Sequence, residues 1–322
     1  MKSSNSSALF LSFVIPVKDE VQTLAGLYQG ISDALKQRDK DLRFEVIFID
    51  DGSTDGSWAE MTRLTEQYPD AIKAIKLRRN FGKAFALSTG FSESKGDIIF
   101  TMDADLQDDP AEIPKFLDKI AEGYDVVSGW KSNRQDPLSK TLPSKFFNKI
   151  TAKLTGVSLH DFNCGFKAYK KEVLEGIKIY GELHRYIPVL AHELGFISAE
   201  VSIKHNKREF GVSKYGWERY ARGLLDLLTV LATTRYLKKP GHLFGGLGVL
   251  SGIVGTIILS YLGILWLIDD SPIGTRPLFA VGILMVILSI QMISIGVLAE
   301  LITRHSDSGP SDSAIADKRG CS

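Results

Sequence analysis

The sequence predicts an α/β domain with a mostly parallel sheet, followed by two helices long enough to cross a membrane. Two observations carry this prediction. Between residues 9 and 203, short apolar runs rich in β-branched residues alternate with stretches of helical spacing. Near the C-terminus, two long segments contain no charged residue. The overall composition, with 24% charged residues, 29 Gly and 11 Pro in 322 residues, excludes a wholly membrane-embedded bundle, a fibrous chain and a disordered chain.

The N-terminal region has the order expected of a doubly covered parallel sheet. Strands are predicted at residues 11–17, 44–49, 71–77, 97–102 and 125–129. Helices are predicted between them at residues 21–35, 57–68, 83–94 and 112–121. Asp55 is placed to cap the second helix, and Pro110 and Pro114 suit the first turn of the fourth.

Charge is distributed unevenly along the chain. Residues 1–203 carry 26 basic and 29 acidic side chains, residues 204–239 carry 9 and 3, and residues 240–322 carry 4 and 6, which nearly cancel to a net charge of +1. This overall balance offers no support for nucleic-acid binding. The two cysteines, Cys164 and Cys321, are too few for a disulfide framework or a four-cysteine zinc site, which favours a reducing compartment.

The two uncharged segments are Leu243–Ile268 and Pro277–Ala299, with 26 and 23 residues. Each exceeds the roughly 20 residues that a helix needs to cross a bilayer. Basic residues precede the first segment and follow the second, whereas the short link between them holds two Asp and one Arg. The positive-inside rule then places the large N-terminal region and the C-terminal tail in the cytoplasm. We find no signal peptide in the first 30 residues.

These patterns divide the chain into five parts. We expect a disordered N-terminus at residues 1–8 and the α/β domain at 9–203. A mobile loop with amphipathic juxtamembrane helices is expected at 204–239, the two spans at 240–302, and a disordered cytoplasmic tail at 303–322.

Acidic residues follow three of the predicted strands. Asp19 and Glu20 follow the first strand, Asp50 and Asp51 the second, and Asp103 the fourth. The carboxyl ends of parallel strands meet at one edge of a sheet, where open α/β folds bind ligands. Turn formation and helix capping are the simpler interpretation of such residues, and they explain Asp55 and Gly56 well.

Asp103 and Asp105 are harder to explain as turn residues, because they directly follow a buried strand. In an extended segment, residues two apart point to the same side. Two carboxylates with open positions beside them suit Mg²⁺ or Mn²⁺ held jointly with a substrate diphosphate, and Gln107 offers a further oxygen. The sequence contains neither a G-x-x-x-x-G-K-[ST] phosphate loop nor a G-x-G-x-x-G after the first strand.

Four segments, taken together, resemble a known family. They are Val14–Glu20, Ile49–Asp55, Arg79–Lys83 and Met102–Asp108, and in order and spacing they are similar to inverting family 2 glycosyltransferases of the GT-A fold. Within that family the chain resembles the polyisoprenyl-phosphate glycosyltransferases, and its two terminal spans make it most similar to the bacterial bactoprenol glucosyltransferases. The resemblance extends over about residues 11–301.

The resemblance implies a nucleotide sugar donor, with UDP-glucose preferred, and a polyprenyl phosphate acceptor such as undecaprenyl phosphate. It also implies a bacterial inner-membrane protein whose catalytic domain is cytoplasmic. Metal-binding residues carried over from the family are Asp103, Asp105 and Gln107. Further donor-binding residues are Pro16, Asp19, Glu20, Asp51, Asn80, Lys83, Arg208 and Lys214, the last two in a loop expected to close over the diphosphate. Residues implied for the acceptor phosphate are Lys131, Lys140 and Ser144.

Lys131 and Lys140 stand where Arg is frequent in the family, which keeps the charge but loses the bidentate fork. Asp161 matches a family residue near the reacting centre, and together with Asp103 and Asp105 it completes the expected catalytic set. A phosphate monoester is already ionised near neutral pH, so we expect Asp161 to orient the reactants rather than to remove a proton. We interpret Cys164 as a small buried residue rather than a nucleophile.

Other functions stay open at this point. The alternatives are transfer of mannose from GDP-mannose or of a modified sugar, a polysaccharide synthase, and a non-catalytic nucleotide-binding membrane protein. The Gln-x-x-Arg-Trp motif of processive synthases is absent, and a non-catalytic protein would be expected to lack one of the acidic clusters, all of which are present. Glycines spaced four apart in the first span favour helix packing, and we expect a homo-oligomer.

Overall fold

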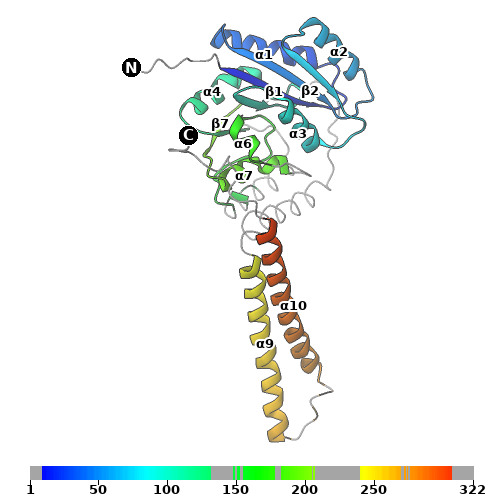
Figure 1. Cartoon of the computed structure of the whole chain (residues 1–322), viewed down its shortest axis with the longest axis vertical. Helices are drawn as coiled ribbons and strands as arrows, with labels where there is room; N and C mark the ends of the chain where they lie inside the picture. Colours follow the sequence, from blue (N-terminus) through cyan, green and yellow to red (C-terminus); the bar gives the residue numbers. More distant parts are fainter. Residues whose placement is uncertain are drawn as a thin grey trace. The chain divides into compact units, whose positions relative to one another are not determined.

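The structure is a computed structural model. It describes residues 9–131, 148, 151–152, 155–177, 183–204, 206, 240–269, 272, 274 and 276–306. The described residues fall into two compact units, one reaching from residue 9 to residue 206 and the other beginning at residue 240. The first is built around a sheet and the second is a pair of long helices (Figure 1).

The described part of the first unit contains a seven-stranded sheet with the order β3-β2-β1-β4-β6-β5-β7. The strands are β1 (Phe10–Val17), β2 (Arg43–Asp50), β3 (Ile72–Lys76), β4 (Ile98–Thr101), β5 (Val126–Trp130), β6 (Lys167–Lys170) and β7 (Ser198–Ser202). Among these strands β6 alone runs antiparallel to its two neighbours, β4 and β5. The predicted mostly parallel sheet is therefore confirmed, with one strand inserted against its direction.

Helices cover both faces of the sheet (Figure 1). The helices and short 3₁₀ turns of this unit are α1 (Leu24–Arg38), α2 (Ser57–Gln67), α3 (Lys83–Glu93), η1 (Pro110–Glu112), α4 (Ile113–Ala121), α6 (Lys171–Glu175), η2 (Leu183–Tyr186) and α7 (Ile187–Glu193). α1, α2 and α4 share one core with the sheet, whereas α3 packs on the opposite face, next to α6 and α7.

Alternation along the strands explains this two-sided burial. On β1, Phe13 and Ile15 belong to the core shared with α1, and Val14 between them packs with α3 on the other face. Because side chains of successive strand residues point to opposite faces, a central strand covered on both sides must be apolar at every position. This is why the strand runs read as nearly continuous apolar stretches.

The second unit is a helical hairpin of α9 (Pro240–Asp269) and α10 (Pro277–Ser306) (Figure 1). Phe244–Ile268 and Pro277–Ile302 are long and apolar enough to cross a membrane. The two helices approach closely at small residues: a Cβ added to Gly248 would lie 3.0 Å from the carbonyl oxygen of Ser289. Both predicted spans are thus helical in the structure, and the chain is a membrane-anchored protein.

Candidate active site

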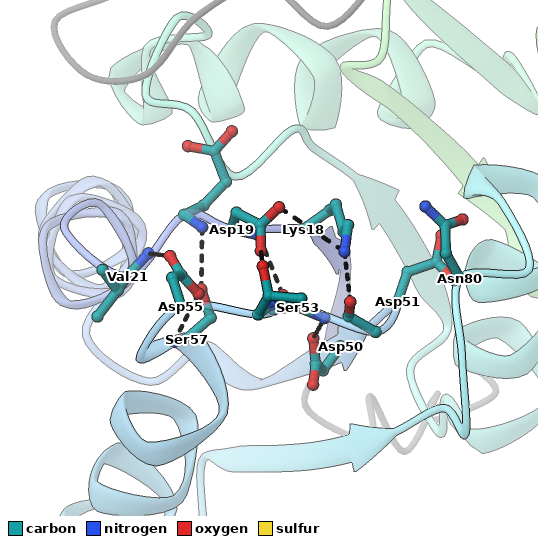
Figure 2. Close-up of polar contacts among 12 residues, drawn as sticks. Lys18, Asp19, Val21, Asp50, Asp51, Ser53, Asp55, Ser57 and Asn80 are labelled. Atoms are coloured by element: carbon teal, nitrogen blue, oxygen red, sulfur yellow. Dashed lines mark hydrogen bonds and ion pairs between the residues drawn. The ribbon is translucent and has the colours of Figure 1, made fainter.

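The loops that follow β1 and β2 are joined by hydrogen bonds between short polar groups (Figure 2). The Asp19 backbone N–H donates to Ser53 Oγ at 3.0 Å, and the Thr54 N–H donates to the Asp19 carboxylate at 2.7 Å. The Glu20 N–H donates to Ser57 Oγ at 2.9 Å. Asp19 has a left-handed backbone (φ 52°), a conformation that Asp tolerates better than most residues. The first two acidic clusters therefore form one connected structure at the carboxyl edge of the sheet.

Asp55, which the sequence places as the cap of the second helix, also takes part in this structure. Its carboxylate accepts the N–H groups of Val21 and Ser57, at 3.3 and 2.9 Å, so it binds the first turn of α2 although Gly56 is the capping residue by position (Figure 2). These bonds lower the pKa of Asp55, outweighing the effect of its partial burial.

Asp51 fixes the loop that leads into α3. Its carboxylate is nearly buried and accepts the backbone N–H groups of Phe81 and Gly82, at 2.7 and 3.0 Å. Gly52, which follows it, has a φ of 71°, and a Cβ there would lie 2.7 Å from the backbone nitrogen of Asn80. The structure thus brings Asn80 beside the loop of Asp51, as Figure 2 shows.

Asp103 lies against Lys83, the first residue of α3, with which it forms a short ion pair. Burial by itself would raise the pKa of Asp103, but the Lys83 charge and hydrogen bond, with Lys131 and His184, outweigh it and lower the pKa to about 2. Gly165 also packs against this carboxylate, because a Cβ there would lie 2.6 Å from Asp103 Oδ2. Asp103 is therefore a carboxylate that is ionised at neutral pH and held in a tightly fitted position.

The segment after Asp103 differs from the extended conformation that we expected. β4 ends at Thr101, Ala104 and Asp105 lie in a turn, and Leu106 has a left-handed φ of 58°. Asp105 Oδ1 accepts the Gln107 N–H at 3.2 Å. The prediction that Asp103 and Asp105 share one side of a strand is thus wrong, because the chain turns here instead of continuing the sheet.

Gln107 connects this turn to the far end of the described unit. Its backbone carbonyl oxygen accepts the backbone N–H of Asn206 at 2.8 Å. Asn206 precedes Arg208 and Lys214, which lie outside the described residues, as do Lys140 and Ser144. The roles of these four residues stay predictions.

Lys131 is held by a buried carboxylate that the sequence analysis did not single out. Its Nζ lies 3.1 Å from Asp108 Oδ1, and both side chains are largely removed from solvent. Burial by itself would lower the pKa of Lys131, but Asp108 and further negative groups outweigh it and raise the pKa. The structure thus brings the amine expected to bind the acceptor phosphate to the same cluster as Asp103.

Asp161 is nearly buried, and a neighbouring glutamate fixes its backbone. Glu200 on β7 accepts the N–H groups of His160 and Asp161, at 2.8 and 3.0 Å. The same glutamate contacts His160 Nδ1 at 2.8 Å, and the His160 ring stacks on Trp130. Cys164 is buried, and burial raises the pKa of its thiol, which agrees with a packing role.

The donor atoms at this edge suit a hard divalent cation. Asp103 is ionised and about a third of its side chain is exposed. Asp105 supplies a second carboxylate in the same turn. Among the residues with described placement, no group of three or more His, Cys, Asp or Glu is arranged as a metal cage. A cation bound here would therefore complete its coordination with substrate oxygens, as Mg²⁺ and Mn²⁺ commonly do.

Several residues of the site had no assigned role in the sequence analysis. They are Asp108, Lys167, His184, Arg185 and Glu200, which lie around Asp103, Lys131 and Asp161. Two of them had a local signal, because Asp108 belongs to the Met102–Asp108 segment and Lys167 lies six residues after Asp161. Glu200 and the His184–Arg185 pair lack such a signal, since only the fold brings them to the site.

Comparisons with known proteins identify the family of the chain. The family model described as glycosyl transferase family 2 matches residues 12–178. The chain is 38% identical to a dodecaprenyl-phosphate galacturonate synthase from Rhizobium johnstonii, over 92% of this chain and 88% of the relative. It is 36% identical to an undecaprenyl-phosphate 4-deoxy-4-formamido-L-arabinose transferase from Pseudomonas syringae, over 92% of this chain and 87% of the relative.

Solved structures support the fold. Glucosyl-3-phosphoglycerate synthase from Mycobacterium tuberculosis, in complex with Mn²⁺, UDP and phosphoglyceric acid, has a TM-score of 0.52 at 17% identity, over 70% of this chain and 78% of that one. A mannosyltransferase from Pyrobaculum calidifontis, in complex with GDP-Man and Mn²⁺, has a TM-score of 0.50 at 16% identity, over 96% of this chain and 78% of that one.

The sheet, its acidic edge and these matches define a glycosyltransferase of the GT-A fold. The chain belongs to glycosyltransferase family 2 and, within it, to the polyprenyl-phosphate sugar transferases.

Proposed function

We propose that this protein transfers a sugar from a UDP-sugar to a polyprenyl phosphate such as undecaprenyl phosphate, at the cytoplasmic face of the membrane and with inversion at the anomeric carbon. One observation carries the proposal: a single chain combines an ionised carboxylate edge suited to a nucleotide diphosphate with two membrane spans. A water-soluble donor fits the first feature and a lipid acceptor fits the second.

The donor side of the reaction is assigned to the loops that Asp19 and Asp51 hold in place. Hydrogen bonds within the chain fix these loops, which reduces the ordering that binding of a nucleoside requires. Lys83 stands at the first turn of α3, where its charge and the helix N-terminus both favour a bound diphosphate. A divalent cation held by Asp103, Asp105 and Gln107 would neutralise negative charge on the leaving diphosphate.

On the acceptor side, an oxygen of the lipid phosphate forms a new bond to the anomeric carbon. The bond from that carbon to the diphosphate oxygen breaks, and the nucleoside diphosphate leaves with the electron pair. No proton is transferred, because the attacking phosphate is already ionised. Lys131, with Lys140 and Ser144, is assigned to the phosphate, and the buried Asp161 to orientation of the reactants.

The identity of the sugar is the most specific part of the proposal. The similarity to two-span bacterial enzymes favours glucose carried by UDP, whereas the relatives above are named for galacturonate and 4-deoxy-4-formamido-L-arabinose. Mannose from GDP-mannose remains the next alternative.

The test uses the purified full-length protein with undecaprenyl phosphate, MnCl₂ or MgCl₂, and a panel of nucleotide sugars that includes UDP-glucose, UDP-galacturonate and GDP-mannose. We expect a lipid-linked monosaccharide by mass spectrometry, and no product from the matched Asp103→Asn variant. A membrane protein that binds UDP-sugars but forms no lipid product would contradict the proposal, and a polymeric product would indicate a polysaccharide synthase.

We also infer a homo-oligomer formed through the spans. Gln291 lies near the middle of the second span and is exposed on α10 rather than packed against α9. An amide exposed to lipid is unfavourable unless it bonds to another helix, which supports contact with a second copy. Light scattering in detergent should show more than one chain per particle. Gln291→Leu should lower the protein mass per particle toward that of the monomer.

A further inference from the structure

Asp108 is a buried carboxylate to which the proposed reaction assigns no role. Its side chain is fully removed from solvent, and its Oδ1 lies 3.1 Å from Lys131 Nζ. A capping role does not explain it, because the next residue, Asp109, has that role: its carboxylate accepts the Ala111 N–H at 3.0 Å, at the start of η1. A purely stabilising role is also a weak explanation, since an apolar pair of similar size is often as stable as a buried ion pair.

The ion pair joins two strand ends that are not neighbours. Asp108 belongs to the segment that follows β4, and Lys131 directly follows β5, whereas β6 lies between these two strands in the sheet. The pair therefore fixes the end of a long, flexible side chain to a distant part of the site. A Lys ammonium has three N–H groups, and the Lys131 side chain is still 13% exposed, so donors remain for a ligand oxygen. Holding the amine in advance reduces the ordering that phosphate binding requires.

The charge of Lys131 depends mainly on Asp108. Burial by itself would lower the pKa of Lys131, and the groups that act against burial are Asp108 first, then the Cys164 sulfur and Asp103. Cys164 is not an effective partner at neutral pH, because burial raises the pKa of its thiol and keeps it protonated. Asp103 already forms an ion pair with Lys83. Loss of the Asp108 charge would therefore leave a buried amine that gives up its proton more easily.

We propose that Asp108 is a positioning residue for the acceptor, which fixes the Lys131 amine at the place where an oxygen of the lipid phosphate binds. The inference rests on the proposed function and deepens it, because it names the group that prepares the acceptor side of the site. Asp108 does not touch the substrate itself, since its side chain has no exposed surface. It acts through Lys131, so its loss should weaken use of the acceptor and leave use of the donor unchanged.

The test compares the full-length wild type with Asp108→Asn, which keeps the shape of the side chain and removes its charge. KM values for undecaprenyl phosphate and for the donor that the wild type uses are measured at pH 7 and at pH 9. We expect Asp108→Asn to raise the KM for undecaprenyl phosphate by about tenfold at pH 7 and by more at pH 9, because the buried amine then loses its proton. The KM for the donor should change by less than about twofold.

Two further variants separate an effect of charge from an effect on structure. When Asp108→Asn is combined with Lys131→Arg, the guanidinium stays protonated, so the KM for undecaprenyl phosphate relative to the wild type should no longer rise with pH. Asp109→Asn is the matched control, since it makes the same change one residue along the chain, at a position where Asn caps a helix as well as Asp does. It should keep the wild-type KM values at both pH values.

A second set of measurements needs no turnover. Only an unprotonated amine reacts with acetic anhydride, so the acetylation rate at Lys131, measured by peptide mass spectrometry, reports its charge. At pH 8 this rate, relative to that of the exposed Lys171, should be about tenfold higher in Asp108→Asn than in the wild type. The buried Lys167 reports any loss of fold, because unfolding would raise its rate as well. Binding of undecaprenyl phosphate without donor, measured by native mass spectrometry, should be about tenfold weaker in Asp108→Asn.

An unchanged KM for undecaprenyl phosphate in Asp108→Asn would overturn the inference. Equal rises in both KM values, or a rise that does not depend on pH and persists with Lys131→Arg, would assign Asp108 to structure alone and also overturn it. If no donor yields a lipid product, the proposed function fails, and the acetylation rate at Lys131 together with the binding of undecaprenyl phosphate still decides the inference.

Discussion

The position of a single glycine controls the geometry of Asp103. A Cβ at residue 165 would lie 2.6–2.8 Å from three atoms of the Asp103 carboxyl group, which no real side chain tolerates. We predict that Gly165→Ala displaces the carboxylate and lowers kcat/KM by about 100-fold, since small displacements of catalytic groups have effects of this size. Mn²⁺ affinity, measured by electron paramagnetic resonance, should fall toward that of Asp103→Asn, while the melting temperature changes little. Normal Mn²⁺ binding by Gly165→Ala would contradict this account.

Lys167 makes stability depend on pH in a definite direction. Its pKa is lowered from 10.5 to about 8 in the folded protein. Below pH 8 both states carry the proton and the folded state bears the cost of a buried charge. Between pH 8 and 10.5 only the unfolded state keeps the proton, so this residue makes folding more favourable as pH rises.

We therefore predict that the melting temperature of the wild type, relative to Lys167→Gln, increases from pH 7.5 to pH 10. The matched variant Lys171→Gln should show no such trend relative to the wild type. If the difference in melting temperature between the wild type and Lys167→Gln stayed constant across this range, the pKa of Lys167 would not be lowered by folding.

The sequence predicted some residues of the site better than others, for a physical reason. Asp51 and Asp103 stand directly after apolar strands, so their place at the sheet edge followed from the topology of parallel sheets. Asp108 lies in the same motif, yet its burial against Lys131 depends on packing between distant segments. His184 is more distant still, and no local pattern distinguishes it from a surface residue.

At the level of elements, the alternation of strands and helices up to β5 was predictable because most of these strands are largely apolar runs. β4 is the exception at its end, since the segment Met102–Leu106 turns away from the sheet. The strands β6 and β7 were not predicted. β6 reads Lys-Ala-Tyr-Lys, and its lysines resemble a surface turn, although Lys167 is buried in the fold. Such a strand is recognisable only once its neighbours β4 and β5 are in place.

The helix α3 depends on a glycine for its approach to the sheet. A Cβ at Gly90 would lie 2.2 Å from Val14 Cγ1 and 2.8 Å from Ile49 Cδ1, on the strands β1 and β2. We predict that Gly90→Ala destabilises the sheet unit by about 1–3 kcal/mol through overpacking, despite the better helix propensity of Ala. Because α3 begins at Lys83, the KM for the donor should rise as well.

Gly26→Ala in α1 is the matched control, since its Cβ would make an ordinary contact at 3.7 Å with Leu106 Cδ1. This variant should be neutral or more stable by up to about 1 kcal/mol. Thermal unfolding followed by near-ultraviolet circular dichroism distinguishes the two, and equal stability of both variants would show that α3 can shift without cost.

For the whole molecule, the near-zero net charge results from opposite contributions that are separated along the chain. An excess of acidic groups up to residue 203, an excess of six basic groups in 204–239 and two uncharged spans cancel in the total. This separation fits an enzyme that binds a soluble donor at carboxylates and approaches an anionic membrane with its basic segment. The averages hide both substrates, and the distribution of charge along the chain indicates them.

The same distribution predicts the orientation of the chain in the membrane. Arg235, Lys238 and Lys239 precede the first span, whereas the link between the spans has a net charge of −1, from two Asp and Arg276. The positive-inside rule places the link outside and the tail, with Cys321, in the cytoplasm. Cys164 does not interfere with labelling, because it is buried and its thiol pKa is raised.

A cysteine introduced at the exposed Gly274 should therefore react with a membrane-impermeant maleimide in intact spheroplasts. Cys321 should react only after the membrane is permeabilised, and a Cys321→Ser background identifies which thiol is labelled. Labelling of Cys321 from the outside, with protection of Gly274→Cys, would invert the topology. The catalytic unit would then face away from the cytoplasmic pool of nucleotide sugars, and the proposed reaction could not take place there.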